Sequence, residues 1–502
     1  MCRKIILLLA AIIFLIVVVF FRAEVYFARP KHISLCNETH KPIQGDDILK
    51  RFSEALQIKT ITKDIRVYDR NELKNFAAFL RKNFPLIHSS SFIKLETVNN
   101  YSLLYYVQGN DSSLKPYLLC SHMDVVPVEL EKWDIDPFAG EIKDGFIYGR
   151  GAVDVKDTLM AIMESLEYLL KHNFMPIRSF YIAFGHDEEG LGLDGAAEIA
   201  QAFRRKDIKE FEFLLDEGTI ILHDSIAGIK ENTALIGVSE KGYVTVRLKV
   251  QSSVGHSSMP TYETAVSVLA KAVAKFNSWA HPSHFGHGPE KKMIEEFALY
   301  AQYPYKIIYS NLWLFGPLLN WILSNNPQSN SMVRTTSAAT VIRGGFKENV
   351  MPSESEALIN HRVHPNQKVA EVIEFDRRLI NDDRVEIEIK DDFIEPHPIS
   401  PYGLDAFGYQ TIKKSIEQVF PETITIPSIM LASTDTRWYL PFTKSVYRFS
   451  PAFLHQNEMK IFHGHNERIS IDNYLKIVNF YHHLMINADK PRLDEPIFKD
   501  EL

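Results

Sequence analysis

The stretch Ser121-His122-Met123-Asp124 carries two side chains that could take part in a metal site, directly after the apolar run 117–120. A buried strand that ends in His-x-Asp presents an imidazole at the carboxyl edge of a sheet, and the carboxylate can hold the other ring nitrogen. A single histidine after a strand is more often a packed structural residue. A metal site is therefore predicted only if further ligands follow later strands.

Four further stretches carry ionisable residues at the ends of predicted strands or turns. They are Gly149–Asp157, Gly185–Gly190, Asp216–Gly218 and Phe462–Glu467. Clustered ionisable residues are costly to bury unless cations or hydrogen bonds compensate them. Each stretch alone could be a solvated loop, but all five together favour a site for two metals. Imidazole and carboxylate ligands without a thiolate suit Zn²⁺, with Mn²⁺ or Co²⁺ as substitutes.

Strand and helix patterns alternate around these stretches. Apolar runs typical of strands occupy 102–107, 117–121, 179–184 and 211–215, and helical spacing of apolar residues occupies 46–58, 71–84 and 157–173. This alternation predicts an α/β domain with a mostly parallel sheet and helices on both faces. The carboxyl ends of parallel strands meet at one edge, so the predicted ligands should lie close together.

The pattern changes after Gly242. Strands and helices then follow in the order β-α-β-β-α-β, over 243–250, 261–276, 338–343, 355–363, 367–380 and 385–390. This order is the ferredoxin-like signature, and it predicts an α+β lid domain, 241–395, inserted between two parts of a catalytic domain, 40–240 and 396–490.

Within the predicted lid, the segment 281–331 is unusually apolar and aromatic. It is predicted to form additional core or a subunit interface, because a surface insertion rarely exposes so much apolar area. The alternative is a wall for a long apolar substrate or for a bilayer surface.

The two ends of the chain indicate the secretory pathway. Residues 1–30 contain Arg3-Lys4 and the unbroken apolar run Ile5–Phe21, which predicts a signal peptide or a signal-anchor. The tail 491–502 ends in Lys-Asp-Glu-Leu, the sequence read by the receptor that retrieves proteins to the endoplasmic reticulum. We therefore expect residence in the lumen of the endoplasmic reticulum and an interaction with the KDEL receptor. Secretion and a single-pass membrane anchor are the alternatives.

Three sequons and the overall composition agree with a luminal globular chain. The sequons lie at Asn37, Asn100 and Asn110, and they predict glycosylation. Of the 502 residues, 24% are charged and the net charge is −7, so there is no basic excess for binding nucleic acid. Only Cys36 and Cys120 follow the N-terminal segment, which allows one disulfide at most.

The ordered motifs resemble those of the co-catalytic zinc peptidases and amidohydrolases, a family that includes aminoacylase-1, carboxypeptidase S and the glutamate carboxypeptidases. The strings that carry the resemblance are HMDVVP, GRGAVDVK, HDEE, DEG, GHSS and HGHNE, over about Asp46 to Asn487. Within the family, the strings VSEKG, SNLWLFGPLL and GHNERIS are most similar to the N-fatty-acyl-amino acid synthase/hydrolases, with carboxypeptidase S next. The resemblance implies a di-zinc aminopeptidase-like α/β domain, interrupted by a ferredoxin-like lid through which some relatives form homodimers.

The resemblance also implies roles for individual residues. Two Zn²⁺ per chain would be held by five ligands: His122, Asp154, Glu189, Asp216 and His463, with Asp154 bridging both ions. Asp124 would orient His122, Glu188 would be the general base, and His256 of the lid would polarise the carbonyl group. Three further residues would hold the substrate: Asn349, Arg362 and Asp435. His465 lies beside His463 and is an alternative ligand.

The implied activity is a reversible, metal-dependent amidase reaction on N-fatty-acyl amino acids, which either releases fatty acid and amino acid or condenses them. A carboxypeptidase acting on dipeptides is the alternative, because it needs the same metals and base. A non-catalytic luminal carrier of acyl amino acids is an alternative of another class. The presence of Glu188 favours an enzyme, since a carrier needs the metals at most.

Overall fold

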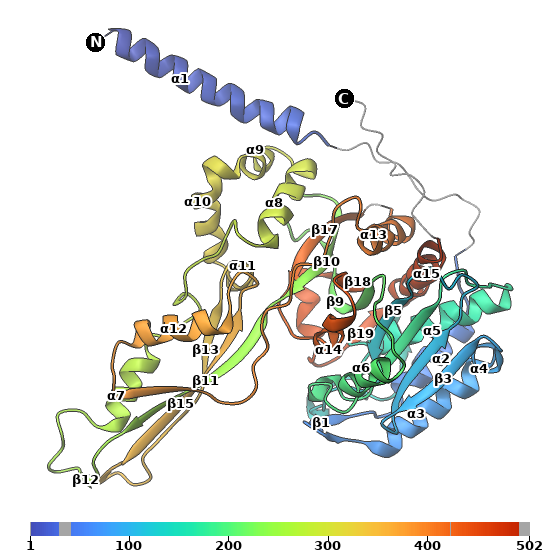
Figure 1. The fold of residues 1–502 in the computed structure, drawn as a ribbon, viewed down its shortest axis with the longest axis horizontal. Coiled ribbons are helices and arrows are strands. Elements are labelled where there is room, and N and C mark those ends of the chain that lie inside the picture. Colours follow the sequence, from blue (N-terminus) through green and yellow to red (C-terminus); the bar gives the residue numbers. More distant parts are fainter. Residues whose placement is uncertain (1, 30–41, 422, 491–502) are drawn as a thin grey trace. The chain divides into compact units, whose positions relative to one another are not determined.

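The computed structural model of the chain describes residues 2–29, 42–421 and 423–490, and Figure 1 colours them along the sequence. The chain forms two compact units. The large unit consists of the described residues within 31–238, 400–427 and 434–502, and the lid unit consists of those within 1–30, 239–399 and 428–433. The N-terminal segment therefore groups with the lid unit.

The large unit is built on an eight-stranded sheet with the strand order β17-β10-β18-β9-β5-β8-β4-β3. The strands are β3 (Ile93–Val98), β4 (Ser102–Val107), β5 (Tyr117–His122), β8 (Phe180–Gly185), β9 (Leu214–His223), β10 (Asn232–Glu240), β17 (Thr423–Met430) and β18 (Val446–His455). The neighbouring strands β18, β9, β5 and β8 are parallel. β4 and β3 continue the sheet in antiparallel pairing, as does β10 beside β18. The predicted α/β class is confirmed, with the parallel pairs in the centre of the sheet.

Helices cover both faces of this sheet, so β5 and β8 are buried over their whole length. On one face, Leu119 shares a core with α5 (Lys156–Lys171), α13 (Phe407–Val419) and α15 (Ile471–Ala488). On the other face, Leu118 packs with α6 (Ala196–Arg205) and α14 (Thr436–Tyr439). A strand buried on both faces is a continuous apolar run in the sequence, which is why β5 and β8 could be predicted closely.

Smaller elements surround the sheet of the large unit. They are α2 (Asp46–Leu56), α3 (Arg70–Asn83), α4 (Pro85–Ser89), the paired strands β1 (Thr62–Asp64) and β2 (Val67–Tyr68), and a three-stranded sheet of β6 (Ile142–Lys143), β7 (Phe146–Tyr148) and β19 (Arg468–Ser470). The predicted helices agree with α2, α3 and α5 apart from their ends. The strand predicted at 211–215 begins instead at Leu214 and continues to His223, because β9 extends along its parallel neighbour β18.

The lid unit contains a four-stranded antiparallel sheet with the order β13-β15-β11-β16. Its elements in chain order are β11 (Gly242–Gln251), α7 (Ala265–Val273), β13 (Thr336–Gly344), β15 (Glu354–Val363), α12 (Val369–Ile380) and β16 (Val385–Ile389), with the short strands β12 (Gly255–His256) and β14 (Val350–Met351) at one end. Val244, Val246, Leu248 and Val250 are buried, while the residues between them are not. Because alternate side chains of a strand point to opposite faces, one face of the sheet packs on the two helices.

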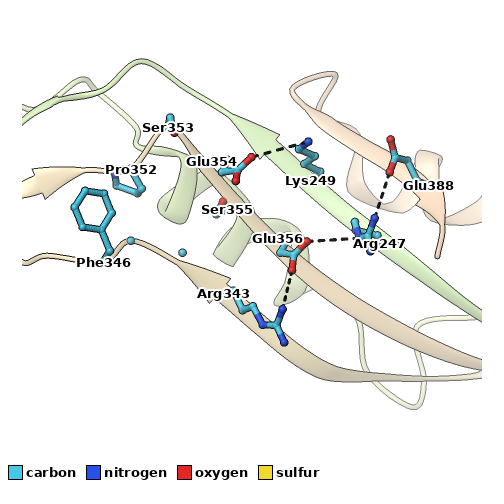
Figure 2. A pocket seen from close by; sticks show the side chains of 12 residues that line it. Arg247, Lys249, Arg343, Phe346, Pro352, Ser353, Glu354, Ser355, Glu356 and Glu388 are labelled. Atoms are coloured by element: carbon cyan, nitrogen blue, oxygen red, sulfur yellow. Dashed lines mark hydrogen bonds and ion pairs between the residues drawn. The ribbon is translucent and has the colours of Figure 1, made fainter. Parts of the chain in front are cut away.

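The other face of the lid sheet carries ion pairs between strands (Figure 2). Arg247 lies 3.5 Å from Glu356 and 3.9 Å from Glu388, and Arg343 lies 3.4 Å from Glu356. These side chains line a hollow of about 420 Å³. Opposite charges face each other across neighbouring strands, which supports their register but adds little stability at an exposed surface. A hollow lined by charges is unsuited to a long acyl chain.

The apolar segment 281–331 forms a group of helices, α8 (Pro289–Tyr300), α9 (Tyr305–Ser310), α10 (Leu312–Ser324) and α11 (Pro327–Val333). The N-terminal run forms α1 (Cys2–Phe21), continued by a π-helical turn, Arg22–Tyr26. Residues Arg3–Tyr26 are long and apolar enough to cross a membrane. The end of α1 contacts the segment at Asn311, whose Nδ2 donates a hydrogen bond to the carbonyl oxygen of Val19 at 3.1 Å.

Candidate metal centre

Three neighbouring parallel strands bring the predicted ligands of the large unit together. His122 is the last residue of β5, Glu188 and Glu189 follow the end of β8 in a 3₁₀ turn, and Asp216 lies on β9. These strands are adjacent in the order β9-β5-β8, so their carboxyl ends share one edge of the sheet. Two loops reach the same edge, one carrying Asp154 just before α5 and one carrying His463 just before β19.

Asp154 lies between two imidazoles. Its Oδ1 is 3.4 Å from His122 Nε2, and its Oδ2 is 3.0 Å from His463 Nε2. His463 Nε2 is also 3.2 Å from Glu189 Oε1. His463 makes these contacts although its side chain is half exposed, and the alternative ligand His465 is exposed as well. Ligand atoms around a tetrahedral zinc are about 3.3 Å apart when the bonds are about 2.0 Å long, which is close to these separations.

Buried polar atoms at this edge have no hydrogen-bond partner among the described residues. They are His122 Nε2, Glu189 Oε1 and Asp216 Oδ2. Burial, followed by neighbouring charges, raises the pKa of Glu189 to about 7 and that of Asp216 to about 8. Carboxylates are costly to enclose together unless a cation compensates them. The residues present therefore fit a pair of divalent cations.

Asp124 connects the histidine to the turn that carries the two glutamates. Its backbone carbonyl oxygen lies 2.9 Å from His122 Nδ1, and its Oδ1 lies 3.3 Å from the same nitrogen. Its two carboxylate oxygens accept hydrogen bonds from the backbone N–H groups of Glu188 and Glu189, at 3.1 Å and 3.2 Å. Asp124 is fully buried, so these contacts are shielded from water. Asp124 thus orients His122 through its carbonyl oxygen and its carboxylate, and the carboxylate also holds the turn after β8.

Glu467 is a buried residue at the end of the ionisable stretch Phe462–Glu467, and no individual role was predicted for it. Its carboxylate accepts hydrogen bonds from the backbone N–H groups of Gly151, Val153 and Asp154, at 3.0, 2.8 and 3.2 Å. It also pairs with Arg150 at 2.6 Å. These contacts hold the loop that presents Asp154. In the sequence, Glu467 could have been recognised only as an acidic residue four positions after His463, in a stretch that also contains His465.

Glu217 is a second residue for which the sequence predicted no individual role. Its Oε1 lies 3.5 Å from His122 Nε2, so it approaches that imidazole directly. Its neighbour Asp216 is buried, with one oxygen accepting from the backbone N–H of Glu217 at 2.9 Å and the other oxygen without a hydrogen-bond partner among the described residues. The structure thus groups Glu217 with His122 and Asp154, whereas the predicted ligand Asp216 is not part of such a group among the described residues.

Asp435 lies in the large unit beside the turn after β8. Burial is the main cause that raises the pKa of this carboxyl well above its usual range, and one of its oxygens has no partner among the described residues. Gly192 has a φ of +62°, and a Cβ there would overlap Asp435 Oδ1. A glycine is therefore required for the close approach of the loop to this carboxylate.

The three remaining predicted residues belong to the lid unit. His256 and Asn349 are exposed and lie at the paired strands β12 and β14, where the backbone N–H of Ser257 donates to the carbonyl oxygen of Asn349 at 3.2 Å. Arg362 is half-buried on β15, its Nη1 donates to Ser433 Oγ at 2.9 Å, and its guanidinium stacks over the ring of Tyr243. Within the lid unit, His256 and Asn349 are therefore neighbours.

Two imidazoles and a set of carboxylates, Glu188 among them, lie at the carboxyl edge of a mixed α/β sheet, and this arrangement defines a metal-dependent hydrolase. The chain belongs to peptidase family M20/M25/M40, whose sequence pattern matches residues 118–487. The family consists of metal-dependent peptidases. The predicted family is confirmed.

Comparison with individual proteins agrees with this assignment. The chain is 44% identical over 449 residues to the N-fatty-acyl-amino acid synthase/hydrolase PM20D1.1 of Danio rerio, which covers 89% of this chain and 87% of that protein. It is 40% identical over 479 residues to the probable carboxypeptidase S-like 2 of Dictyostelium discoideum, covering 93% and 89%. The fold is similar to that of an M20 family metallo-carboxypeptidase from Sulfolobus solfataricus, with a TM-score of 0.66, 18% identity and coverage of 89% and 100%.

Proposed function

We propose that this protein is a zinc-dependent amidase that cleaves N-fatty-acyl amino acids and also joins fatty acid to amino acid. The observation that carries the proposal is the set of contacts of Asp154 with His122 and His463, next to the turn that bears Glu188. The similarity to a named N-fatty-acyl-amino acid synthase/hydrolase over 89% of the chain supports the choice of substrate.

Two Zn²⁺ would be held by the five predicted ligands, with Glu217 available to the ion at His122. The ligands are His122, Asp154, Glu189, Asp216 and His463. When bound, the two ions would acidify a water molecule and balance the negative charge that develops on the amide oxygen.

Glu188 would move protons in both directions of the reaction. It lies in the same turn as the ligand Glu189, and Asp124 holds the backbone of that turn. Burial, followed by the charge of Glu217, raises the pKa of Glu188 well above its usual range. A carboxyl group with a raised pKa can take a proton from water and return it to the departing amine. In the condensation direction, the same carboxyl takes the proton from the attacking amine.

The lid residues are proposed to hold the substrate. His256 would donate a hydrogen bond to the carbonyl oxygen, while Asn349 and Arg362 would bind the free carboxylate of the amino acid, which suits a planar guanidinium. In the large unit, Asp435 would line the substrate side of the turn that carries Glu188. Asp124 acts through His122 and the turn, and is a positioning residue.

Cleavage of dipeptides by a carboxypeptidase reaction is the second candidate. The similarity to a probable carboxypeptidase S-like protein over 93% of the chain favours it. Both reactions use the same ligands and base, and they differ in what binds the acyl side of the amide.

The test uses the purified full-length protein loaded with zinc, together with a Glu188→Gln variant. An N-oleoyl amino acid and an acyl-blocked dipeptide are offered in parallel, and the products are measured by mass spectrometry. We expect release of oleate by the wild type and a loss of at least about 10³-fold in the variant, which should retain its metal. Cleavage of the dipeptide alone would identify a carboxypeptidase. Absence of both activities in the zinc-loaded protein would favour a carrier.

We further propose that the protein resides in the lumen of the endoplasmic reticulum, with α1 retained as a membrane anchor. The contacts of the end of α1 with the lid unit support retention of this helix. The C-terminal residues Lys499–Leu502, which would bind the KDEL receptor, and the sequon at Asn37 lie outside the described residues. Asn100 and Asn110 are exposed and accessible to glycosylation. Microscopy of the full chain and of a chain lacking Lys499–Leu502 tests the location, and an identical distribution would contradict it.

A homodimer through the lid sheet is a further proposal. β13 is an edge strand of that sheet, and its residue Ile342 is 60% exposed. Exposed edge strands can pair with a second copy of the same chain. Light scattering in detergent should then give the mass of a dimer for the wild type and of a monomer for Ile342→Pro. The mass of a monomer for the wild type would contradict the proposal.

A further inference from the structure

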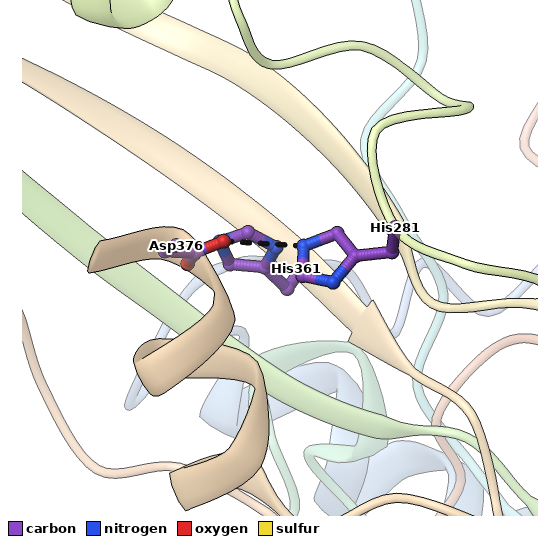
Figure 3. Close-up of side chains that lie close together, drawn as sticks. All are labelled: His281, His361 and Asp376. Atoms are coloured by element: carbon purple, nitrogen blue, oxygen red, sulfur yellow. Dashed lines mark ion pairs between the residues drawn. The ribbon is translucent and has the colours of Figure 1, made fainter. Parts of the chain in front are cut away.

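A second group of metal-binding side-chain types lies in the lid unit, in none of the motifs that indicated the family. His281, His361 and Asp376 come from a loop, from β15 and from α12, and their possible ligand atoms lie within 4.8 Å of one another (Figure 3). His281 Nε2 is 3.2 Å from one oxygen of Asp376, and His361 Nε2 is 3.1 Å from the other. All three side chains are completely buried.

Two of these residues occupy positions where the fold calls for apolar side chains. On β15, His361 lies between the buried residues Ile359 and Val363, on the face that packs on the helices. On α12, Asp376 continues the buried stripe of Val372 and Ile380. Replacing a buried ion pair with apolar residues is often neutral or stabilising. Apolar residues would thus fill these positions at no cost to the fold, and the presence of ligand types there indicates another role.

The orientation of the side chains is that of ligands rather than of hydrogen-bonded partners. Although the distances to Asp376 are short, both Nε2 atoms and both carboxylate oxygens have no hydrogen bond among the described residues. The ring nitrogens therefore do not point along the lines to the oxygens. These nitrogen-to-oxygen distances are close to that between His463 Nε2 and Glu189 Oε1 in the metal centre, which is 3.2 Å. Glu189 Oε1 also has no hydrogen-bond partner among the described residues. It is also close to the separation of about 3.3 Å expected around a tetrahedral zinc.

One neighbouring side chain holds His361 in a fixed orientation, as in known metal sites. Ser337 Oγ lies 3.0 Å from the other ring nitrogen of His361, and such a contact fixes the orientation of an imidazole ligand.

We propose that His281, His361 and Asp376 bind an additional Zn²⁺, a structural ion enclosed in the lid unit. Two imidazoles and one carboxylate supply three ligands of the types that zinc takes in proteins. The ion would fasten the start of the apolar segment 281–331 to the lid sheet. The end of that segment is held at the same place, since Arg334 Nη1 donates to the carbonyl oxygen of His281 at 2.9 Å.

The zinc content of the purified full-length protein tests this site. Zinc per chain is measured by mass spectrometry of the element, after dialysis against a weak chelator, for the wild type, Asp376→Asn and Asp383→Asn. Asp383 is an exposed residue near the end of α12 and serves as the matched control. We expect Asp376→Asn to hold one zinc fewer than the wild type and the control. Equal zinc in all three proteins would overturn the proposal.

A complementary variant leaves the lid unit unchanged, in case Asp376→Asn does not fold. The combined substitution His122→Ala, Asp154→Ala and His463→Ala removes the metal centre of the large unit. This variant should retain one zinc per chain, and cobalt in its place should give the visible absorption of a tetrahedral site. A variant without any bound metal would overturn the proposal. The readout is independent of the reaction catalysed, so failure of the proposed amidase activity would leave this result unaffected.

A different observation, the exposed face of α10, points to a second inference. Five large apolar residues of α10 are exposed: Trp313, Leu314, Leu318, Trp321 and Ile322. Leu314, Leu318, Trp321 and Ile322 follow one another at helical spacing, with Trp313 beside them, and together they form an apolar stripe on one side of a helix that contains no charged residue. The two tryptophans are 54% and 65% exposed, and tryptophan favours the interface between lipid and water.

The position of α1 within the lid unit identifies what covers this stripe. Arg22, at the end of α1, donates to the carbonyl oxygen of Ser310 at 3.2 Å, and Lys306 lies 3.8 Å from Glu24. Phe20 stacks on Tyr303. These residues belong to α9 and its flanks, directly before α10. If α1 spans a bilayer, its charged end marks the surface of that bilayer, and α10 begins beside it.

We infer that α10 lies in the surface of the bilayer that α1 spans. This inference rests on the proposed retention of α1, and it would hold the lid where a long-chain acyl substrate partitions into the membrane. α10 thus acts as an interfacial helix whose apolar stripe enters the lipid.

Quenching of tryptophan fluorescence by brominated lipids tests the position of α10 in the reconstituted full-length protein. α1 contains no tryptophan, so it contributes no such signal. We expect strong quenching in the wild type and in Trp133→Phe/Trp438→Phe, and at least about a halving of the quenched fraction in Trp313→Phe/Trp321→Phe. Equal quenching in all three proteins would overturn the inference. The intact mass of the reconstituted protein reports whether α1 is retained, which separates failure of the anchor from failure of the docking.

Discussion

The two clusters of imidazole and carboxylate groups in this chain use the same side-chain types in different surroundings. The cluster of the large unit lies at an open edge of parallel strands, with more carboxylates than two histidines can balance. The cluster of the lid unit has one carboxylate for two histidines and is completely buried. The additional carboxylates in the large unit could bind metals and also act as a base on substrate and water. The completely buried cluster of the lid unit is not accessible to substrate, so its role would be structural.

The largest expected difference in activity is between the variants Asp154→Asn and Asp376→Asn. Asp154→Asn weakens the contacts with both imidazoles of the metal centre, so we expect kcat/KM to fall by at least about 10³-fold. Asp376→Asn should change kcat/KM by less than about 5-fold, because it lies in the lid core. Steady-state kinetics of both variants, measured on protein of native size, provide the comparison. Similar losses in the two variants would show that the clusters are not functionally distinct.

A smaller effect should distinguish the two carboxylates of β9. Asp216 has a buried oxygen without a hydrogen-bond partner among the described residues, whereas Glu217 is less enclosed and lies close to His122 and Asp154. We expect Asp216→Asn to reduce zinc affinity and kcat/KM by about 10²-fold, and Glu217→Gln by about 10-fold. Zinc titration of the apo variants measures the first quantity. The reverse order would identify Glu217 as the ligand.

The smallest expected effect is on stability, and it concerns Lys241, a buried cation of the lid unit. Burial, followed by the charge of Arg362, lowers the pKa of Lys241 to about 7, and its Nζ donates to the carbonyl oxygens of Ser331 and Arg334. In the unfolded chain the pKa is about 10.4, so the unfolded state binds more protons between these values and stability should rise with pH. The gain from this group is about 2–3 kcal/mol between pH 7 and pH 9.

Denaturant unfolding at pH 7, 8 and 9 measures this contribution. The difference in unfolding free energy between the wild type and Lys241→Met should change with pH in favour of the wild type. Lys347→Met, at an exposed position, is the matched control and should run parallel to the wild type. A constant difference for Lys241→Met would mean that Lys241 keeps an ordinary pKa in the folded protein.

The sequence predicted the strands that carry the proposed ligands, because these residues lie at the ends of apolar runs. His122, Glu189 and Asp216 each follow or end a segment whose burial on both faces is evident from composition. The contact of Glu217 with His122 could not be predicted, because it depends on a side-chain rotamer. β18 was missed, since Arg448 and Pro451 interrupt its apolar pattern, although Arg448 is fully buried in the sheet.

The lid cluster was invisible in the sequence for a related reason. Periodicity identifies the buried face of β15 and of α12, but it does not tell which side chains meet across that face. His361 and Asp376 appeared as isolated polar residues on otherwise apolar faces. Their third partner, His281, is far away in the sequence, and only the folded lid brings it to them.

The contacts of Glu467 have a consequence for the order of events during synthesis. The loop that presents Asp154 is held by a residue near the C-terminus, and His463 comes from the same late segment. Because a chain is released from the ribosome from its N-terminus onward, the early ligands emerge long before the groups that complete the centre. The site can therefore close only after almost the entire polypeptide has been translated, and a chain truncated before residue 463 would carry the acidic cluster without the means to complete it.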